Sequence, residues 1–383
     1  MFASLIQFVR EQYRTNDFIP LHAPVFAGHE RDYVLETIES TFVSSVGAFV
    51  DRFERDMAAY TGSPRAIATV NGTAALHTAL LLAGVKPGEL VVTQALTFVA
   101  TCNAIAYCGA QPVFVDVDRH TLGLSPNALA VWLEESAQID SDGLCRLKAN
   151  GQVIRACLPM HTFGHPVELD DLVALCERWG LVLVEDAAES LGSFYKGRHT
   201  GCFGQLGTLS FNGNKIITTG GGGMVLTNEE MGTRAKHLTT TAKQPHPYEY
   251  VHDEVGYNYR LPNLNAALGC AQLEQLEGFV NAKRELASRY DRLLEGSDLQ
   301  FVREPNECRS NYWLNAVLCE SHEHRDALLK ATNDKGVMTR PIWHLMNHLS
   351  IYSHCLHGDL TNSEWLADRV VNLPSSVMLE LTA

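Results

Sequence analysis

The sequence predicts an α/β fold in which a mostly parallel β-sheet is covered by helices on both faces. Three observations lead to this prediction. Between about residues 65 and 230, short apolar runs alternate with stretches of helical spacing. The apolar runs are nearly continuous, which is typical of strands buried on both faces. No internal repeat or low-complexity tract interrupts this alternation.

Seven apolar runs are expected to form strands. They cover residues 66–70, 90–93, 112–116, 153–159, 181–185, 208–211 and 223–227. Five intervening stretches have helical spacing or strong helix formers, namely residues 74–83, 101–108, 125–135, 169–179 and 228–238. Ligands of such sheets bind at the carboxyl ends of the strands, so residues that follow the strands are the candidates for chemistry.

The composition changes in the last third of the chain. Residues 266–294 have the pattern of one or two long helices with charged faces. Residues 313–319 are expected to form a strand and residues 323–333 a helix. We therefore expect a large α/β domain over residues 1–262, including an amphipathic N-terminal helix, and a smaller α+β domain over residues 263–383.

Composition and charge exclude several classes of protein. Apolar residues make up 46% of the 383 residues and charged residues 19%, so the chain can bury a core. There are 44 acidic and 30 basic residues, which argues against nucleic acid or an anionic membrane as the main partner. Ten cysteines without CxxC pairs are typical of reduced thiols in a cytosolic protein. We expect a cytoplasmic protein without a membrane span.

The residues after the first expected strand suit a phosphate group. Gly72 allows close backbone approach, and the amides at the start of the next helix lie beside the Thr73 hydroxyl. The alternative is an ordinary helix cap without a ligand, which is the favoured interpretation of this motif when it is taken alone.

A carboxylate, Asp186, stands at the end of another buried strand. A carboxylate in this place can keep a heterocyclic nitrogen protonated, which turns an aromatic ring into an electron sink. The alternatives are a cap for the following segment or, together with Glu185, a metal ligand. The two acids alone do not distinguish these roles.

Lys215 stands in the loop that follows a further strand. An ammonium group is costly to bury unless it is paired or deprotonated, and covalent chemistry with a carbonyl cofactor uses such a lysine. The alternative is a surface lysine. The glycines at 220–223 lack the GxGxxG placement of a dinucleotide site and are expected to let the backbone pass close to the lysine loop. Phe98 also follows a strand and suits stacking on a planar ring, although a core phenylalanine is the default.

In this order the motifs resemble those of the DegT/DnrJ/EryC1/StrS family of sugar-nucleotide aminotransferases. The resemblance implies the aspartate-aminotransferase-like fold, fold type I, and the cofactor pyridoxal 5'-phosphate. It covers nearly the whole chain and is carried by residues 45–47, 71–74, 97–98, 161–164, 185–190, 210–215, 256–260, 340–343 and 372–376.

The resemblance implies a role for each matching residue around the cofactor. Lys215 would bond covalently to the cofactor and later move protons, and Asp186 would pair with the pyridinium nitrogen. Phe98 would stack on the ring. The phosphate would be held by Gly72, Thr73 and Ser210, and by Asn258 from the neighbouring subunit. This last role implies a homodimer with shared active sites.

The resemblance also implies the substrates. Glutamate would donate an amino group to C4 of a nucleotide-linked 4-keto-6-deoxy sugar, for cell-surface glycan synthesis. Residues 210–220 and 340–343 are most similar to enzymes of legionaminic acid and bacillosamine synthesis, which implies an N-acetylated sugar carried on UDP. A GDP-perosamine-type enzyme has closely similar motifs and is the alternative. The candidate substrate-binding residues are Ser45, Glu189, Arg260, Arg340 and His344.

Two further functions stay open at this point. Some proteins of this fold replace the lysine by histidine and dehydrate sugars, and Lys215 weighs against that activity. A non-catalytic sugar-nucleotide sensor is disfavoured by the intact cofactor residues and the acidic charge. We expect no metal site, because His161 and His165 lack an acidic partner at zincin spacing.

Overall fold

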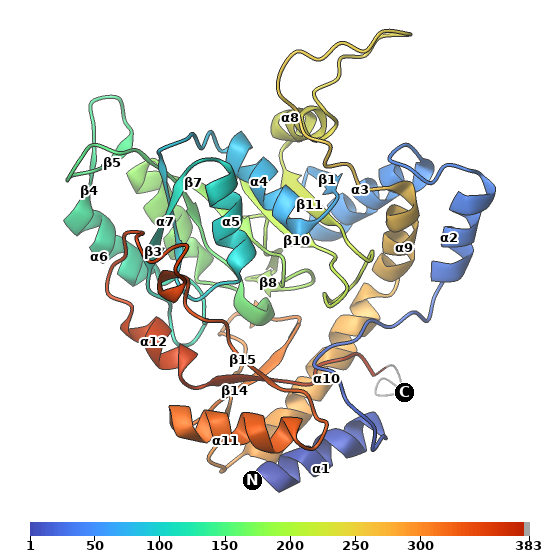
Figure 1. Ribbon diagram of the computed structural model, residues 1–383, viewed down its shortest axis with the longest axis vertical. Coiled ribbons are helices and arrows are strands. Elements are labelled where there is room, and N and C mark those ends of the chain that lie inside the picture. The colour runs from blue at the N-terminus through green and yellow to red at the C-terminus, as the bar shows by residue number, and fades with distance from the viewer. Residues whose placement is uncertain (379–383) are drawn as a thin grey trace.

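The computed structural model describes residues 1–378 and has the expected α/β architecture, with a seven-stranded sheet at its centre (Figure 1). The strand order is β1-β11-β10-β7-β6-β2-β3. The strands are β1 (Arg65–Thr69), β2 (Leu90–Gln94), β3 (Gln111–Val115), β6 (Ile154–Leu158), β7 (Val182–Asp186), β10 (Leu206–Ser210) and β11 (Gly223–Thr227). Strands β10, β7, β6, β2 and β3 run parallel, while β11 is antiparallel to both of its neighbours. The expectation of a mostly parallel sheet is thus confirmed.

Helices cover both faces of this sheet. One face carries α4 (Gly72–Leu82), α5 (Val99–Tyr107) and α8 (Glu229–Thr239), and the other carries α6 (Pro126–Ser136) and α7 (Leu169–Trp179). Val91 packs into the first of these cores, and its neighbours Leu90 and Val92 pack into the second. Because successive strand residues point to opposite faces, an apolar run without alternation is what this two-sided burial requires.

The observed bounds differ from the expected ones by one or two residues. Helix α4 begins at Gly72, two residues before the expected start. The Asn71 side chain explains this difference, because its Oδ1 accepts a hydrogen bond from the Ala74 amide at 2.8 Å and caps the helix. Helix α7 has the expected bounds.

A second sheet, in the order β12-β14-β16-β15, lies in the C-terminal part of the chain. Its strands are β12 (Gln300–Phe301), β14 (Asn315–Leu318), β15 (Arg340–Pro341) and β16 (Val370–Leu373). The accompanying helices are α9 (Asn263–Leu273), α10 (Leu276–Leu294), α11 (His322–Asn333) and α12 (Thr361–Ala367). The expected long helical region therefore forms two helices, α9 and α10.

Shorter elements complete the fold. Strands β4 (Ala137–Ile139) and β5 (Cys145–Leu147) form a hairpin, and β8 (Phe194–Tyr195), β9 (Arg198–His199) and β13 (Cys308–Arg309) form a small sheet. Helices α2 (Glu30–Glu39) and α3 (Ala48–Thr61) pack on α9, and there are short 3-10 turns at Thr162–Gly164 and Met346–His348. Within residues 1–378, no helix combines the length and apolar character needed to cross a bilayer.

The N-terminal helix α1 (Phe2–Tyr13) packs against C-terminal elements, which differs from its expected place in the larger domain. Leu5 and Val9 lie in one core with Tyr290 of α10 and Leu328 of α11. Figure 1 shows the blue N-terminal helix beside the orange α11, at the end of the molecule away from the large sheet. The amphipathic pattern predicted the helix, but not the surface that covers its apolar face. The domain boundary at residue 262 stays a prediction.

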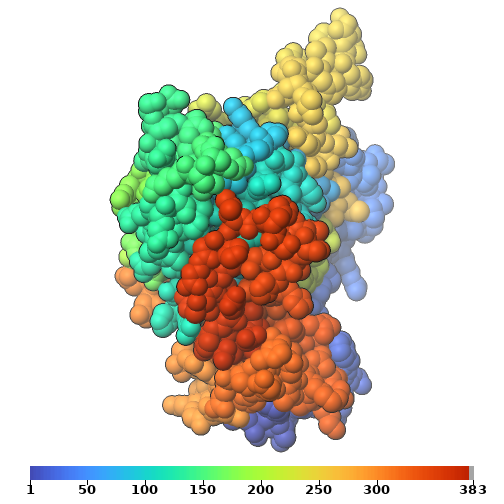
Figure 2. Space-filling view, turned by 60° about the vertical axis from the view of Figure 1, so that its left-hand side comes forward, coloured from blue at the N-terminus to red at the C-terminus, as the bar shows by residue number. Residues whose placement is uncertain are grey.

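A loop of residues 243–255, which we call the projecting loop, extends away from the rest of the chain (Figure 2, yellow). It is closed by pairing of Lys243 with His252. Tyr248 at its end is 83% exposed, and Tyr250 and Val255 are similarly exposed. Exposed aromatic and apolar side chains on a protruding segment are typical of a surface that another chain covers.

Candidate active site

The expected phosphate seat forms where β10 ends beside the first turn of α4. A Cβ atom at position 72 would lie 2.8 Å from the Ser210 Cβ and 2.9 Å from its Oγ, so only glycine allows this close approach. The amides of Gly72 and Thr73 occupy the first two helical positions and therefore have no acceptor within α4. Gly223 of β11 is equally restricted, because a Cβ there would lie 2.7 Å from the Gly72 nitrogen.

Asp186 ends β7, next to β10, and its side chain is almost completely buried. The Thr101 hydroxyl donates to its Oδ2 at 2.7 Å, and the Ala188 amide donates to its Oδ1 at 3.1 Å. Burial raises the pKa of Asp186, while these hydrogen bonds and the charge of Lys215 act in the opposite direction. Asp186 has no ion pair within the described chain, so this carboxylate is suited to a cationic ligand group.

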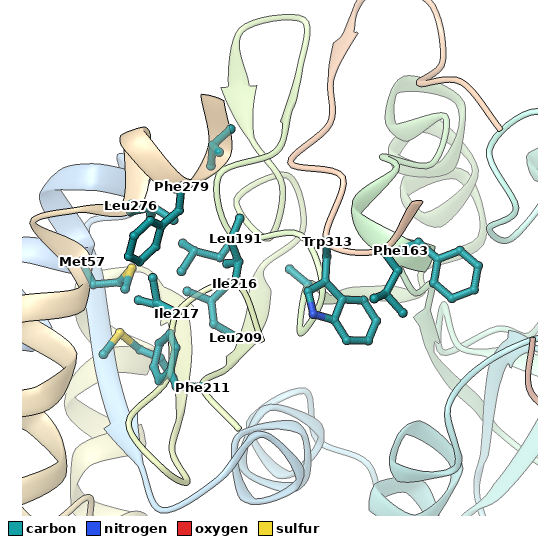
Figure 3. Packing of buried hydrophobic residues seen from close by; sticks show 14 of the residues in the cluster. Met57, Phe163, Leu191, Leu209, Phe211, Ile216, Ile217, Leu276, Phe279 and Trp313 are labelled. Atoms are coloured by element: carbon teal, nitrogen blue, oxygen red, sulfur yellow. The ribbon is translucent and has the colours of Figure 1, made fainter. Parts of the chain in front are cut away.

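Lys215 is fixed in place by the residues around it in the loop after β10. Figure 3 shows the next two residues, Ile216 and Ile217, inserted among Met57 and Leu276 of the core. The Lys215 amide donates to the Asn212 carbonyl at 3.0 Å. The buried side chains of Ile216 and Ile217 fix the backbone of this loop. The fold therefore sets the direction of the Lys215 side chain.

The Lys215 ammonium group lies between a carboxylate and an aromatic ring. Its Nζ is 3.2 Å from the Glu189 Oε1 and 4.1 Å from the centre of the Trp313 ring. The lysine side chain is only 12% exposed. The charge of Lys215 opposes the rise in the pKa of Asp186, so the two side chains are close enough to interact electrostatically.

Glu189, an expected substrate-binding residue, therefore contacts the lysine. Its Oε2 accepts a hydrogen bond from the Phe163 amide at 3.0 Å. Burial raises the pKa of Glu189 to about 7, and the positive charge of Lys215 opposes this shift. A carboxyl group that titrates near neutral pH beside an amine is suited to exchange protons with it.

These residues fit pyridoxal phosphate. The start of α4, where Gly72 has no Cβ atom, is suited to the phosphate. The buried Asp186 carboxylate is suited to the protonated ring nitrogen, and the enclosed Lys215 amine is suited to the aldehyde carbon. Each group follows a strand, as expected: β7 and β10 are adjacent in the sheet, and the start of α4 packs beside β10.

A cleft of about 690 Å³ adjoins the lysine. Asn214, which precedes Lys215, and Trp313 are among the residues that line it. Arg340 and His344, both predicted from the sequence, also line it and are exposed. Two cationic or hydrogen-bonding side chains in a cleft beside the amine are suited to a phosphorylated substrate.

Four other predicted residues lie at the edge of the site or away from this cleft. Asn258 is exposed, and its Oδ1 accepts a hydrogen bond from the Arg260 Nε at 3.0 Å. Arg260 pairs with Thr69 at the end of β1. Phe98 is 47% exposed, with its ring 6.2 Å from that of Trp343. Ser45 is half-buried in the loop before α3 and is not among the residues that line the cleft.

Two residues of the site were not found by sequence reasoning. Trp313 was assigned only to an expected strand, whereas it precedes β14 and touches Lys215. Thr101 was assigned only to a helix, whereas it donates to Asp186. The position of Thr101 in the turn after Phe98 was the available signal, because the start of a helix at a strand end faces the same edge of the sheet.

Comparison with known proteins identifies the family of this chain. The profile of the DegT/DnrJ/EryC1/StrS aminotransferase family matches residues 25–383. The GDP-perosamine synthase of Escherichia coli O157:H7 is 37% identical over 94% of this chain and 93% of its own length. The GDP-perosamine synthase of Caulobacter vibrioides is 36% identical over 93% of each chain. The crystal structure of the aminotransferase TlmJ from Streptoalloteichus hindustanus is 29% identical, with a TM-score of 0.84 over 94% of this chain and 93% of TlmJ. The chain therefore belongs to the DegT/DnrJ/EryC1/StrS family of pyridoxal phosphate-dependent sugar aminotransferases.

Proposed function

We propose that this aminotransferase moves an amino group from glutamate to C4 of a nucleotide-linked 4-keto-6-deoxy sugar. The observation that carries the proposal is the placement of the buried Asp186 carboxylate at the end of β7 and of the enclosed Lys215 amine in the loop after the neighbouring strand β10. The carboxylate comes from a strand end and the amine from a loop, and such separate origins suit charge pairing at one end of a ring and covalent attachment at the other.

The side chains divide the work as follows. Pyridoxal phosphate, when bound, supplies an electron sink for the negative charge that develops on the donor. Asp186 would keep the ring nitrogen protonated, Gly72, Thr73 and Ser210 would hold the phosphate, and Phe98 would stack on the ring. The Lys215 amine would serve as the proton carrier, and Glu189, 3.2 Å away, would exchange protons with that amine.

The sugar nucleotide is proposed to bind in the cleft beside Lys215. Arg340 and His344 are placed there to contact the diphosphate or the sugar. The sequence motifs put a UDP-linked N-acetylated sugar first, but the two relatives named GDP-perosamine synthase favour the GDP-linked alternative. We therefore propose a GDP-linked 4-keto-6-deoxy sugar as the first acceptor to test, with Arg260 and Ser45 as further candidate contacts.

We also propose a homodimer with shared active sites. The exposed Asn258 side chain and the exposed apolar residues of the projecting loop support this assembly. In the dimer, Asn258 of one subunit contacts the cofactor phosphate of the other. The twofold arrangement makes the contact reciprocal, so each dimer completes two equivalent sites.

The test is an amination assay with GDP-, UDP- and dTDP-linked 4-keto-6-deoxy sugars, each with glutamate as donor, read by product mass. We expect a mass change of one oxo group replaced by one amino group, with the GDP sugar turned over with the highest kcat/KM. A faster UDP sugar would restore the first assignment from the motifs. No product from any sugar, by protein that carries the cofactor, would overturn the proposed substrate class.

A further inference from the structure

Trp313 packs its ring against the amine of Lys215, although the two residues lie in different parts of the fold. The Nζ is 4.1 Å from the ring centre, well within the distance at which a cation is attracted to an aromatic face. Figure 3 places Trp313 and Phe163 together on one side of the view, apart from the labelled residues of the lysine loop.

We propose that Trp313 is a positioning residue that holds the protonated amine of Lys215 by a cation–π interaction whenever that amine is not bonded to the cofactor. The inference rests on the proposed role of Lys215. During each amino transfer the lysine must leave the cofactor and stay close enough to return to it. A site that holds the released ammonium group nearby favours both the release and the return of the lysine.

The surroundings of the amine explain why the aromatic ring matters. The lysine side chain is 12% exposed, so water cannot fully solvate its charge. Glu189 is the one carboxylate that forms an ion pair with Lys215 among residues 1–378. Because burial raises the pKa of Glu189 to about 7, this partner is partly protonated at neutral pH. The tryptophan face supplies attraction that does not depend on the charge of Glu189.

Hydrogen bonds fix the tryptophan on three sides. Its Nε1 donates to the Asn214 carbonyl at 2.7 Å, directly before Lys215. Its amide donates to the Asn311 Oδ1 at 2.8 Å, and its carbonyl accepts from the fully buried Lys283 at 3.0 Å. One of these bonds holds the indole ring itself and the other two hold the backbone of Trp313, so the ring is a fixed surface instead of a flexible contact.

The same network links the tryptophan to Glu189. The Asn311 Nδ2 donates to the Glu189 carbonyl at 2.9 Å, while the Asn311 Oδ1 accepts from the Trp313 amide. Asn311 therefore sets the distance between Trp313 and Glu189, the two residues that contact the Lys215 amine. Asn311 itself is closely packed, because a Cβ atom at Gly164 would lie 1.8 Å from the Asn311 Oδ1.

The test compares two ligands on the holoenzyme. α-Methyl-L-glutamate has an amine that displaces Lys215 from the cofactor but no α-proton, so the reaction stops with the lysine free. Glutarate has the two carboxylates without the amine and leaves the lysine bonded. We expect Trp313→Leu to lower the affinity for α-methylglutamate by about 3- to 30-fold, from the usual strength of cation–π contacts. The affinity for glutarate should not change.

Two further variants sharpen the result. Trp313→Phe keeps an aromatic face, so its affinity for α-methylglutamate should stay within about threefold of that of the unmodified protein. Trp365→Leu is the matched control, because Trp365 also stacks on cations, Arg119 at 4.3 Å and Arg369 at 4.8 Å, yet does not line the cleft. It should leave both ligands unaffected.

A measurement without substitution covers the case in which Trp313→Leu does not fold. Fluorinated tryptophan, incorporated at all five positions, weakens the attraction of the ring for cations with little change in its shape. The fluorinated residue should lower the affinity for α-methylglutamate in the protein that has Trp313. It should not change this affinity in Trp313→Phe.

Three results would overturn the inference: equal weakening of both ligands, no weakening of either, or a loss in Trp313→Phe as large as in Trp313→Leu. Failure of the proposed function has a different signature: no keto-sugar is aminated if the substrate class is wrong, and Lys215→Ala still bonds the cofactor covalently if the role of Lys215 is wrong. If the unmodified protein binds neither ligand, only the choice of glutamate as donor fails. Methylamine, which displaces the lysine without a carboxylate, then takes the place of α-methylglutamate in the same series.

Discussion

The two sides of the active site differ in how completely one chain builds them. On the inner side, Asp186 is 3% exposed and has two hydrogen bonds, and Lys215 is enclosed by Glu189 and Trp313. On the outer side, Phe98 is 47% exposed, and Asn258 is an exposed side chain. The inner side is formed at neighbouring strand ends, whereas the outer side consists of a helix start and a loop near the projecting loop.

This difference teaches which residues depend on assembly. Strand ends in a packed sheet are held by the ladder and by core side chains, so their geometry is present in a single chain. Among the residues that the structure describes, the exposed Asn258 side chain is hydrogen-bonded to Arg260 alone and has no comparable restraint. We therefore expect substitutions on the inner side to act at any protein concentration, and substitution of Asn258 on the outer side to act through the partner subunit.

The largest expected effect is that of Lys215→Ala. Loss of the amine removes both the covalent attachment and the proton carrier, so kcat should fall by at least about 10⁴-fold. Borohydride reduction followed by peptide mass spectrometry should find the cofactor on residue 215 in the unmodified protein and nowhere in the variant. Lys196→Ala, which removes an exposed lysine paired with Asp170, is the control and should behave normally.

The second largest effect is expected for Asp186→Asn. The amide keeps the shape and can still accept from Thr101, but it cannot pair with a protonated ring nitrogen. We expect kcat to fall by about 10²–10³-fold, the usual cost of removing one preorganised electrostatic partner. The measurement is single-turnover amino transfer with cofactor at saturation. A variant with normal kcat and only weakened cofactor binding would assign Asp186 to binding alone.

Glu189→Gln should change how stability depends on pH. Burial raises the pKa of Glu189 to about 7 in the folded protein, above its ordinary value of 4.5. The folded state therefore binds this proton more tightly than the unfolded state, and stability is lost as the pH rises from about 4.5 to 7. The loss approaches about 3 kcal/mol above pH 7, and it should be absent in the variant.

Urea unfolding of both proteins between pH 4.5 and 8, without added cofactor, measures this difference. The free energies of unfolding should diverge as the pH rises, with the variant more stable at pH 8. Glu307→Gln removes a carboxylate with an exposed side chain and is the control for general charge effects. Parallel curves for Glu189→Gln and the unmodified protein would show that Glu189 titrates normally.

The inner side of the site was predictable because its positions follow from strand ends. Apolar runs marked where β7 and β10 end, and parallel strands bring their carboxyl ends to one edge of the sheet. Asp186, Ser210 and the loop of Lys215 were therefore expected at this edge, and the pairing of β7 with β10 brings them close together. Gly72 followed from the same rule, because α4 starts at the end of β1.

The rest could not be predicted, because it depends on which surfaces meet. Trp313 belongs to the C-terminal part, and nothing in its local pattern distinguishes a core tryptophan from one that faces Lys215. The packing of α1 on α11 has the same origin, since an amphipathic helix specifies an apolar face without naming its partner. Side-chain contacts between distant segments are a property of the whole fold.

Asn258→Ala should have the smallest effect of the four substitutions. It is informative because Asn258 lies on the outer side of the site. Loss of one hydrogen bond to a charged phosphate should weaken cofactor binding by about 10- to 100-fold, measured by dialysis equilibrium. Because Asn258 is proposed to serve the partner's site, a mixed dimer of Asn258→Ala and Lys215→Ala subunits contains one intact site and one site with both defects. At limiting cofactor, co-expression of the two variants should therefore restore activity above either parent. If Asn258 serves its own subunit, both sites of the mixed dimer are damaged and no activity returns, which would remove the distinction between an inner side built by one chain and an outer side built by two.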